Sequence, residues 1–188
     1  MVIAVTGTPG TGKETFARTL AKKIDGEVIS FNRLVEEERA YRVDKEGIKV
    51  VNLAKVKRAF ARRIAGKKVA IVEGHLSHWL SRKLLTHVVV LRTHPGVLRK
   101  RLIKKGQRGR KLLDNIEAEA LDIILWEAVK IHGRKRVYEI DTSRISSETA
   151  VNLFLQAVGG KRSLAPGKVS WLEDYFSHFV KRQKIDKR

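Results

Sequence analysis

The stretch MVIAVTGTPGTGKETFARTLA, residues 1–21, decides the fold. It contains a short apolar segment (2–5), the glycine-rich loop GTPGTGK (7–13) and then a helix-like pattern. This order predicts a phosphate-binding P-loop, because glycines let backbone N–H groups turn toward one anion and a helix N-terminus adds positive potential there. Lys13 is then placed to reach the outer phosphates of a nucleoside triphosphate. The alternative interpretation is a glycine-rich turn between a strand and a helix.

One position departs from the strict P-loop pattern. Glu14 follows Lys13, where the pattern has Ser or Thr to hold Mg²⁺, and the hydroxyl comes one place later at Thr15. Lys-Glu-Thr is closer to the Lys-Gly-Thr of adenylate-kinase loops. Glu14 is therefore either a direct or water-mediated Mg²⁺ ligand or a solvated acid in the first helical turn, where it suits the helix dipole.

The composition sets limits on the class of protein. The chain has 188 residues, 43% of them hydrophobic, which suits one domain with a real core. The absence of cysteine excludes disulfides, thiol catalysis and cysteine-ligated zinc. The first apolar stretch is too short for a signal peptide, and no 18-residue apolar run follows. We therefore expect a soluble, cytoplasmic protein without a membrane partner.

The net charge of +20 exceeds what a nucleotide pocket needs. Basic residues gather at 55–68 and 99–111, neither of which contains an acid, and again after residue 160. Each cluster alone is compatible with a solvated helix face. The excess over the whole chain favours an RNA or ribonucleoprotein partner, since a polyphosphate backbone attracts Lys and Arg without sequence readout.

Apolar runs and helical periodicity predict five strands that alternate with helices. The expected strands are 2–5, 27–31, 69–72, 87–91 and 137–140; the expected helices are 13–24, 34–42, 53–65, 95–105, 114–129 and 147–158. Residues 43–51 should form a polar turn with short extended pieces, and Asp114 with Glu117 suggests a capping box. Such alternation predicts a three-layer α/β fold with a five-stranded parallel sheet and a ligand at the carboxyl ends of the strands.

The end of the chain is expected to be separate from this body. Residues 159–168 should be a linker between a domain at 1–158 and a basic C-terminal segment at 169–188. The aromatic pattern of 169–181 predicts a helix that packs either on the body or on a partner.

The third expected strand ends in Val72-Glu73-Gly74-His75. An acid at this place in a P-loop protein orients Mg²⁺ through water, although a strand-end Glu can also form a turn hydrogen bond. His75 lies on the same edge of the sheet. It is a candidate to hold an attacking water or to contact a phosphate, or it is structural.

These pieces resemble a known family, the atypical adenylate kinases of archaea and eukaryotes, whose human member is the coilin-interacting nuclear ATPase protein. The matching stretches are GTPGTGK (7–13), VEGH (72–75), VLRT (90–93) and LDNIEAE (113–119), which together span residues 1 to about 158. Members are nucleoside monophosphate kinases with ATPase activity and maturation factors of the small ribosomal subunit.

The resemblance implies an adenylate-kinase core with an acceptor-binding segment near 30–53 and a short lid near 104–114. It also implies ATP, Mg²⁺ and AMP or another monophosphate as ligands, and the small ribosomal subunit, a platform ribosomal protein and rRNA as partners. This chain departs from the family pattern at Glu14, at Glu73 in place of the commoner Asp, and at Lys105, where the lid arginine is expected.

The resulting hypothesis is a kinase acting on Mg·ATP, with a rival in which nucleotide turnover is an ATPase switch for ribosome assembly and monophosphate phosphorylation is incidental. In the first, Lys13, Glu73 and His75 are catalytic. We expect Gly10, Gly12 and Lys13 to hold the β- and γ-phosphates, Thr15 to contact the α-phosphate or the metal shell, and Glu73 to orient Mg²⁺. The basic lid residues Lys105, Arg108 and Arg110 should close over the γ-phosphate. Arg39 or Arg42 should bind the acceptor phosphate.

Overall fold

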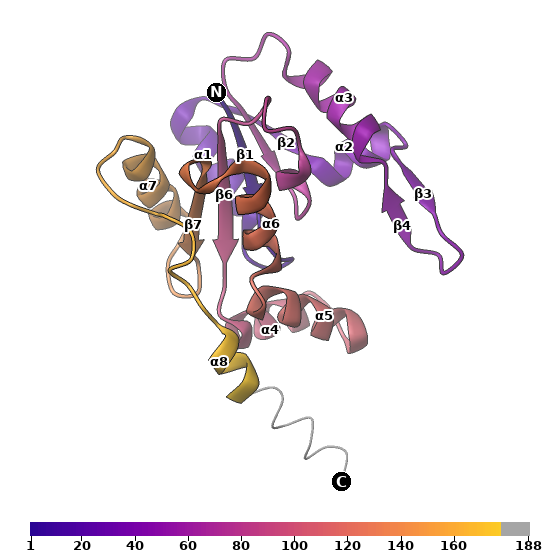
Figure 1. The fold of residues 1–188 in the computed structure, drawn as a ribbon, viewed down its shortest axis with the longest axis vertical. Coiled ribbons are helices and arrows are strands. Elements are labelled where there is room, and N and C mark those ends of the chain that lie inside the picture. Colours follow the sequence, from indigo (N-terminus) through magenta and orange to yellow (C-terminus); the bar gives the residue numbers. More distant parts are fainter. Residues whose placement is uncertain (178–188) are drawn as a thin grey trace.

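The computed structural model describes residues 1–177 and is built on a five-stranded parallel sheet in the order β2-β5-β1-β6-β7. Figure 1 shows this sheet with helices on both faces. The strands are β1 (Val2–Thr6), β2 (Glu27–Ser30), β5 (Ala70–Glu73), β6 (His87–Arg92) and β7 (Val137–Asp141). All five predicted strands are confirmed to within one residue at each end.

Alternate residues of each strand enter different halves of the core. Ile3 and Val5 of β1 pack on one face with α1 and α7, whereas Ala4 packs on the other with α2, α3 and α6. The helices are α1 (Lys13–Ile24), α2 (Phe31–Glu37), α3 (Leu53–Ile64), α4 (Pro95–Lys104), α5 (Gly109–Ala120), α6 (Ile123–His132), α7 (Ser147–Val158) and α8 (Leu172–Tyr175), with single 3-10 turns at Ser77–Trp79 and Arg134–Arg136. This is the three-layer arrangement that the sequence predicted.

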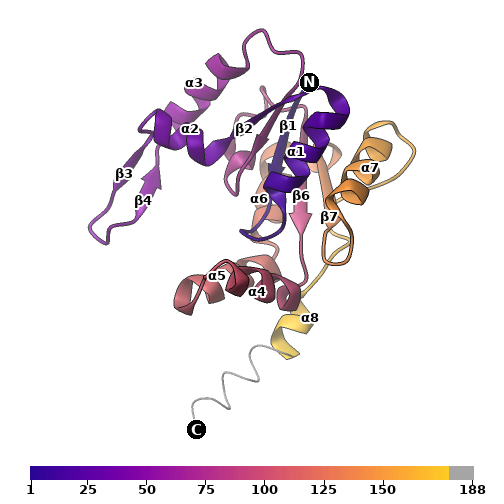
Figure 2. The same ribbon diagram turned by 180° about the vertical axis from the view of Figure 1, so that it is seen from behind.

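Helices α4 and α5 form a separate small unit at the carboxyl edge of the sheet. They pack through Leu98, Leu102, Leu112 and Ile116. Figure 2 shows this pair beyond the ends of β1 and β6, next to the start of α1. The P-loop therefore lies between the central sheet and this helical pair.

The helix predicted over 34–42 is wrong in its second half. Helix α2 ends at Glu37, Arg39 adopts φ 46°, and the chain continues as a hairpin of β3 (Tyr41–Val43) and β4 (Lys49–Val51). Ala40 is fully buried at this turn and accepts a backbone hydrogen bond from Asn52. The hairpin projects away from the body in Figure 1, because its two strands pair only with each other.

The single helix predicted over 114–129 is also wrong. Helix α5 begins at Gly109, so Asp114 lies inside it and makes no capping box, and the chain breaks before α6 at Asp122, where φ is 56°. Arg92 explains the break. Its guanidinium donates to the Glu119 carbonyl and to the Asp122 carboxylate, which satisfies polar groups at the end of α5.

The segment expected as a linker lies against the edge strand β7. Glu139 donates its backbone N–H to the Leu164 carbonyl, and its carboxylate accepts from the N–H groups of Gly167 and Lys168 at 2.8 Å. Further on, Trp171 packs edge-to-face against His94, with ring centroids 5.1 Å apart. The described start of the expected C-terminal helix therefore contacts the body, and its continuation past 177 lies outside the described residues.

Within residues 1–177, no helix combines the length and the apolar character needed to cross a membrane.

Candidate active site

The P-loop connects β1 to α1 and is shaped by glycines that no other residue can replace without strain. Gly7 has φ 138°, and a Cβ there would lie 2.4 Å from the Leu91 carbonyl oxygen. Gly10 has φ 96°, and a Cβ there would meet Leu98 at 2.8 Å. Gly12, with φ 93°, caps α1. The first N–H groups of α1 are thus presented to a ligand at the helix N-terminus.

Lys13 folds back across the loop. Its Nζ donates to the Thr8 carbonyl at 3.0 Å. Burial lowers the pKa of Lys13 from 10.5 to about 8; the negative charges of Glu73 and Glu119 oppose this shift, and Lys105 adds to it. Near neutral pH the ammonium is charged and incompletely neutralised, which suits it to bind phosphate oxygens.

A cavity of about 380 Å³ in front of the P-loop brings together the residues predicted for phosphate and metal chemistry. Those that line it are Gly10, Gly12, Lys13, Glu14, Thr15, Glu73, His75 and Lys105. They come from the P-loop, α1, the end of β5 and the end of α4, which are distant in sequence. Arg108 and Arg110 do not line it; Arg108 donates to the Ile103 carbonyl and Arg110 pairs with Asp114.

The side-chain oxygens that line this cavity suit a Mg²⁺ ion that is also coordinated by phosphate oxygens. Among residues 1–177, no three His, Asp or Glu side chains gather into a complete metal site. Mg²⁺ is commonly bound by one or two protein oxygens together with substrate phosphates and water, and Thr15 and Glu73 supply oxygens of that kind. The Glu14 carboxylate bonds to Arg18 at 2.8 Å and is largely exposed, although it borders the same cavity.

His75 follows Glu73 at this edge of the sheet. Burial lowers its pKa, and the positive charge of Lys13 lowers it further. The imidazole is therefore neutral near pH 7 and able to accept a proton.

A second cavity, of about 490 Å³, opens beside the P-loop. Phe16, Leu91 and Ile145 give it an apolar lining, and Arg101 with Lys105 gives it positive charge. Arg101 is held by the Thr142 carbonyl at 2.9 Å. An apolar pocket with a few polar groups next to a phosphate site suits a nucleobase and ribose.

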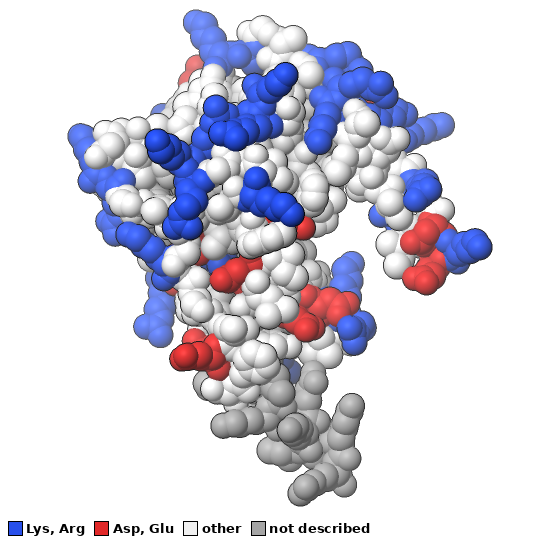
Figure 3. Space-filling view, in the orientation of Figure 1, with Lys and Arg blue, Asp and Glu red and all other residues white. Residues whose placement is uncertain are grey.

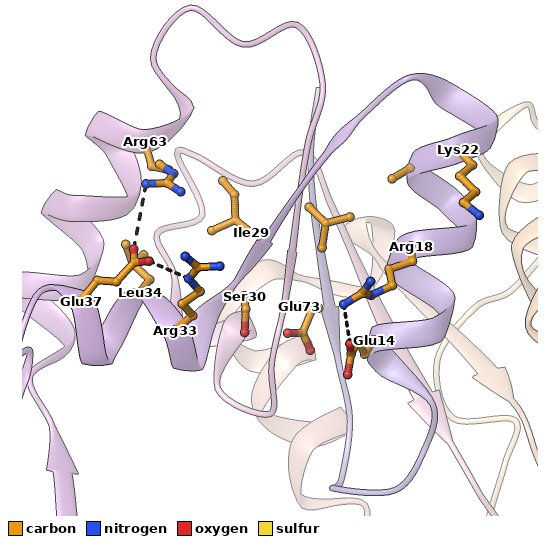
Figure 4. Close-up of a pocket in the computed structure, with 12 residues that line it drawn as sticks. Glu14, Arg18, Lys22, Ile29, Ser30, Arg33, Leu34, Glu37, Arg63 and Glu73 are labelled. Atoms are coloured by element: carbon orange, nitrogen blue, oxygen red, sulfur yellow. Dashed lines mark hydrogen bonds and ion pairs between the residues drawn. The ribbon is translucent and has the colours of Figure 1, made fainter.

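The third cavity, of about 690 Å³, is the largest of the three and lies between α1, β2, α2 and α3 (Figure 4). Glu73 lines both this cavity and the 380 Å³ cavity. Arg33 and Arg63 point into the 690 Å³ cavity, and both approach the Glu37 carboxylate, at 2.7 Å and 4.0 Å. Arg39 and Arg42, expected from the sequence to bind the acceptor phosphate, do not line this cavity. Arg33 and Arg63 were not among the site residues predicted from the sequence, where Arg33 is marked only by its place after β2 and Arg63 only by its place in the basic cluster 55–68.

The three cavities adjoin one another, since the 380 Å³ cavity shares lining residues with each of the other two. The 380 Å³ cavity shares Gly10, Gly12 and Lys105 with the apolar cavity, and Glu14, Ser30 and Glu73 with the largest one. Two ligands that occupy the outer cavities would thus meet in front of Lys13. Fold and P-loop together define the class: an α/β protein of the P-loop kinase type.

Comparison with known proteins identifies the family. The profile of a family described as "AAA domain" matches residues 3–122. A protein of Natronomonas pharaonis named "Putative adenylate kinase" is 39% identical over 92% of this chain and 99% of its own, and one of the same name from Methanocaldococcus jannaschii is 33% identical over 96% and 98%. The chain belongs to this family of P-loop kinases.

A solved structure supports the fold assignment. Shikimate kinase from Bacteroides thetaiotaomicron superposes with a TM-score of 0.57 at 20% identity, over 85% of this chain and 98% of that one. At this level of identity the likeness concerns the fold alone.

Proposed function

We propose that this protein is an adenylate kinase-type nucleoside monophosphate kinase, which converts ATP and AMP into two ADP. The observation that carries the proposal is the arrangement of two larger cavities on either flank of the 380 Å³ cavity that Lys13 and Glu73 line, each sharing residues with it. The names of the archaeal relatives agree with it.

In this proposal the residues act mainly by positioning and by neutralising charge, which is what phosphoryl transfer requires. The ATP base lies against Phe16 and Ile145, and Gly10, Gly12 and Lys13 hold the β- and γ-phosphates. Arg33 and Arg63 bind the phosphate of AMP, displacing Glu37. Lys105 offsets the charge that develops between the two phosphates.

Thr15 and Glu73 would hold Mg²⁺, which when bound supplies positive charge to the phosphate oxygens. Glu73 does so through water in this proposal. Glu14 stays paired with Arg18 and serves the helix dipole instead.

Product analysis tests the proposal. Purified protein is incubated with Mg·ATP plus AMP or with Mg·ATP alone, and nucleotides are separated by chromatography, with Lys13→Ala as the control for contaminating kinases. We expect two ADP for each ATP consumed when AMP is present. If wild type forms no AMP-dependent ADP above the Lys13→Ala background, the adenylate kinase assignment is wrong.

An ATPase activity is the second part of the proposal, and His75 is the residue that supports it. A neutral imidazole on the cavity in front of Lys13 can orient or deprotonate a water, whereas an acceptor phosphate is held by its own pocket. His75→Ala should therefore lower ATP hydrolysis more than transfer to AMP. Equal losses in the two reactions would indicate a role in ATP binding instead.

A second candidate function, favoured by the surface charge, is a cytoplasmic ATPase switch in maturation of the small ribosomal subunit, with rRNA and a platform ribosomal protein as partners. Figure 3 shows Lys and Arg spread over the upper part of one face, with the acidic groups lower down and at the hairpin tip. Lys55, Arg58 and Arg62 are exposed on α3.

A salt titration of binding to small-subunit rRNA tests this candidate. Affinity should fall steeply, with a log–log slope of about −0.7 for each contact to single-stranded RNA. Ending the chain after residue 177 removes five Lys or Arg and one Asp but keeps the segment on β7, so the slope should flatten while kinase turnover stays. Binding that does not depend on salt would exclude the electrostatic interface.

A further inference from the structure

A buried carboxylate, that of Glu119, lies next to the P-loop but does not itself line the phosphate cavity. Glu119 of α5 is 2% exposed, and its Oε2 accepts the Thr8 hydroxyl at 2.6 Å. Thr8 in turn fixes the loop, because its carbonyl accepts from Lys13 Nζ at 3.0 Å and from the Thr11 hydroxyl at 2.9 Å. Glu119 thus holds the residue on which the loop and its lysine converge.

The other oxygen of Glu119 is also fully used. Its Oε1 accepts from Arg92 Nε at 2.8 Å and from the Thr93 N–H at 2.9 Å. Arg92 is buried too and binds Glu139 at 3.0 Å on its far side. A carboxylate held by three donors from Thr8, Arg92 and Thr93 has its orientation fixed, so Thr8 is fixed relative to β6 and α5.

This arrangement joins two walls of the phosphate cavity. Thr8 belongs to the P-loop, whereas Glu119 belongs to the helix that follows Lys105 and Gln107, two further residues that line this cavity. The separation in sequence between Thr8 and Glu119 is 111 residues. The bond therefore sets the spacing between the loop and the helical pair α4–α5.

We propose that Glu119 is a positioning residue for the nucleotide site: held by Arg92, it fixes Thr8 and so sets the P-loop curvature from which Lys13 reaches the phosphates. This inference rests only on nucleotide binding at the P-loop and not on the identity of the acceptor. In this proposal the buried ion pairs of Arg92 with Glu119 and Glu139 contribute to ligand affinity as well as to folding.

Two matched pairs of variants separate positioning from stability. Thr8→Val removes the hydroxyl, whereas Thr8→Ser keeps it. Glu119→Gln and Glu139→Gln each remove one charge beside Arg92 from buried sites, but Glu139 bonds to the segment 167–169 and does not contact the P-loop. The dissociation constant for Mg·ATP is measured for the full chain by titration calorimetry, together with the melting temperature.

We expect Thr8→Val to bind Mg·ATP at least tenfold more weakly than Thr8→Ser, and Glu119→Gln at least tenfold more weakly than Glu139→Gln, at comparable melting temperatures.

Equal Mg·ATP affinities in Thr8→Val and Thr8→Ser would overturn the proposal, even if Glu119→Gln failed to fold. So would a Glu139→Gln variant that weakens binding as much as Glu119→Gln. Wild-type protein that binds Mg·ATP but makes no ADP from AMP would instead contradict the kinase assignment and leave this inference standing.

Discussion

The two sides of the candidate site are built from different interactions. Around the P-loop, Thr8, Thr11 and Thr142 are at most 8% exposed, and their hydroxyls are all hydrogen-bonded. Around the proposed acceptor cavity, the polar contacts are surface ion pairs, Arg33–Glu37 and Arg63–Glu37, with exposed side chains. An unsatisfied buried polar group costs about 1–3 kcal/mol, whereas a surface ion pair contributes at most about 1 kcal/mol.

The contrast between buried hydrogen bonds and surface ion pairs indicates that the site is preformed at the P-loop and can adjust around the 690 Å³ cavity. The P-loop side, the proposed donor side, has one arrangement that keeps its buried groups satisfied. The proposed acceptor side, from α2 through the β3–β4 hairpin to α3, can exchange ion pairs at small cost. In the proposed kinase, this division would let the acceptor side close and complete the site around a fixed donor side.

The strongest test of the fixed side is Lys13→Ala. We expect a loss of roughly 10³-fold in turnover with AMP, of the size seen when a single charge-stabilising group is removed. The melting temperature at pH 7 should not fall: the lowered pKa of Lys13 means that the folded state disfavours its charge below pH 8, so removing it costs no stability.

Steady-state kinetics and thermal melting measure both effects, with Lys23→Ala as the control, because Lys23 lies on the same helix and outside the three cavities. Turnover within threefold of wild type would contradict the P-loop assignment.

The sequence predicted the preformed side well and the adjustable side poorly. The P-loop and the five strands follow from glycines at fixed spacing and from short apolar runs, which are local signals. Arg33 and Arg63 were missed because exposed basic residues are common in a chain with 40 Lys and Arg, and only the tertiary fold selects two of them.

The break between α5 and α6 could not be predicted from local pattern. Apolar residues continue at helical spacing through it, and neither Gly nor Pro marks it. Its cause is Arg92, which is 30 residues away from Asp122. Arg92 also holds the Glu119 carboxylate. The break after α5 and the fixed position of Glu119, neither of which was predicted from the sequence, therefore share one cause: a buried guanidinium whose N–H groups need hydrogen-bond acceptors.

Paired glycine substitutions sharpen the contrast in rigidity. Gly7→Ala places a Cβ 2.4 Å from a backbone oxygen, whereas Gly47→Ala in the hairpin meets nothing within 4 Å, although both glycines have positive φ. We expect Gly7→Ala to lose more than about 3 kcal/mol of stability and Gly47→Ala about 1 kcal/mol. Urea unfolding measures both. Similar losses would mean that the backbone around the P-loop yields as easily as the hairpin.

The smallest expected effect concerns the acceptor side and compares two adjacent arginines of α3. Arg63 points into the 690 Å³ cavity, whereas Arg62 pairs with Glu38 and does not line it. Arg63→Ala should raise the KM for AMP about tenfold, since a charged hydrogen bond to a ligand contributes about 1.5–3 kcal/mol, and leave the KM for ATP unchanged. Arg62→Ala, which removes an exposed positive charge from the same helix, should change neither KM. Initial rates at varied AMP and saturating ATP decide the matter. Equal effects of the two substitutions would mean that α3 acts through its general positive potential, and the acceptor phosphate would then have to be bound elsewhere in the cavity.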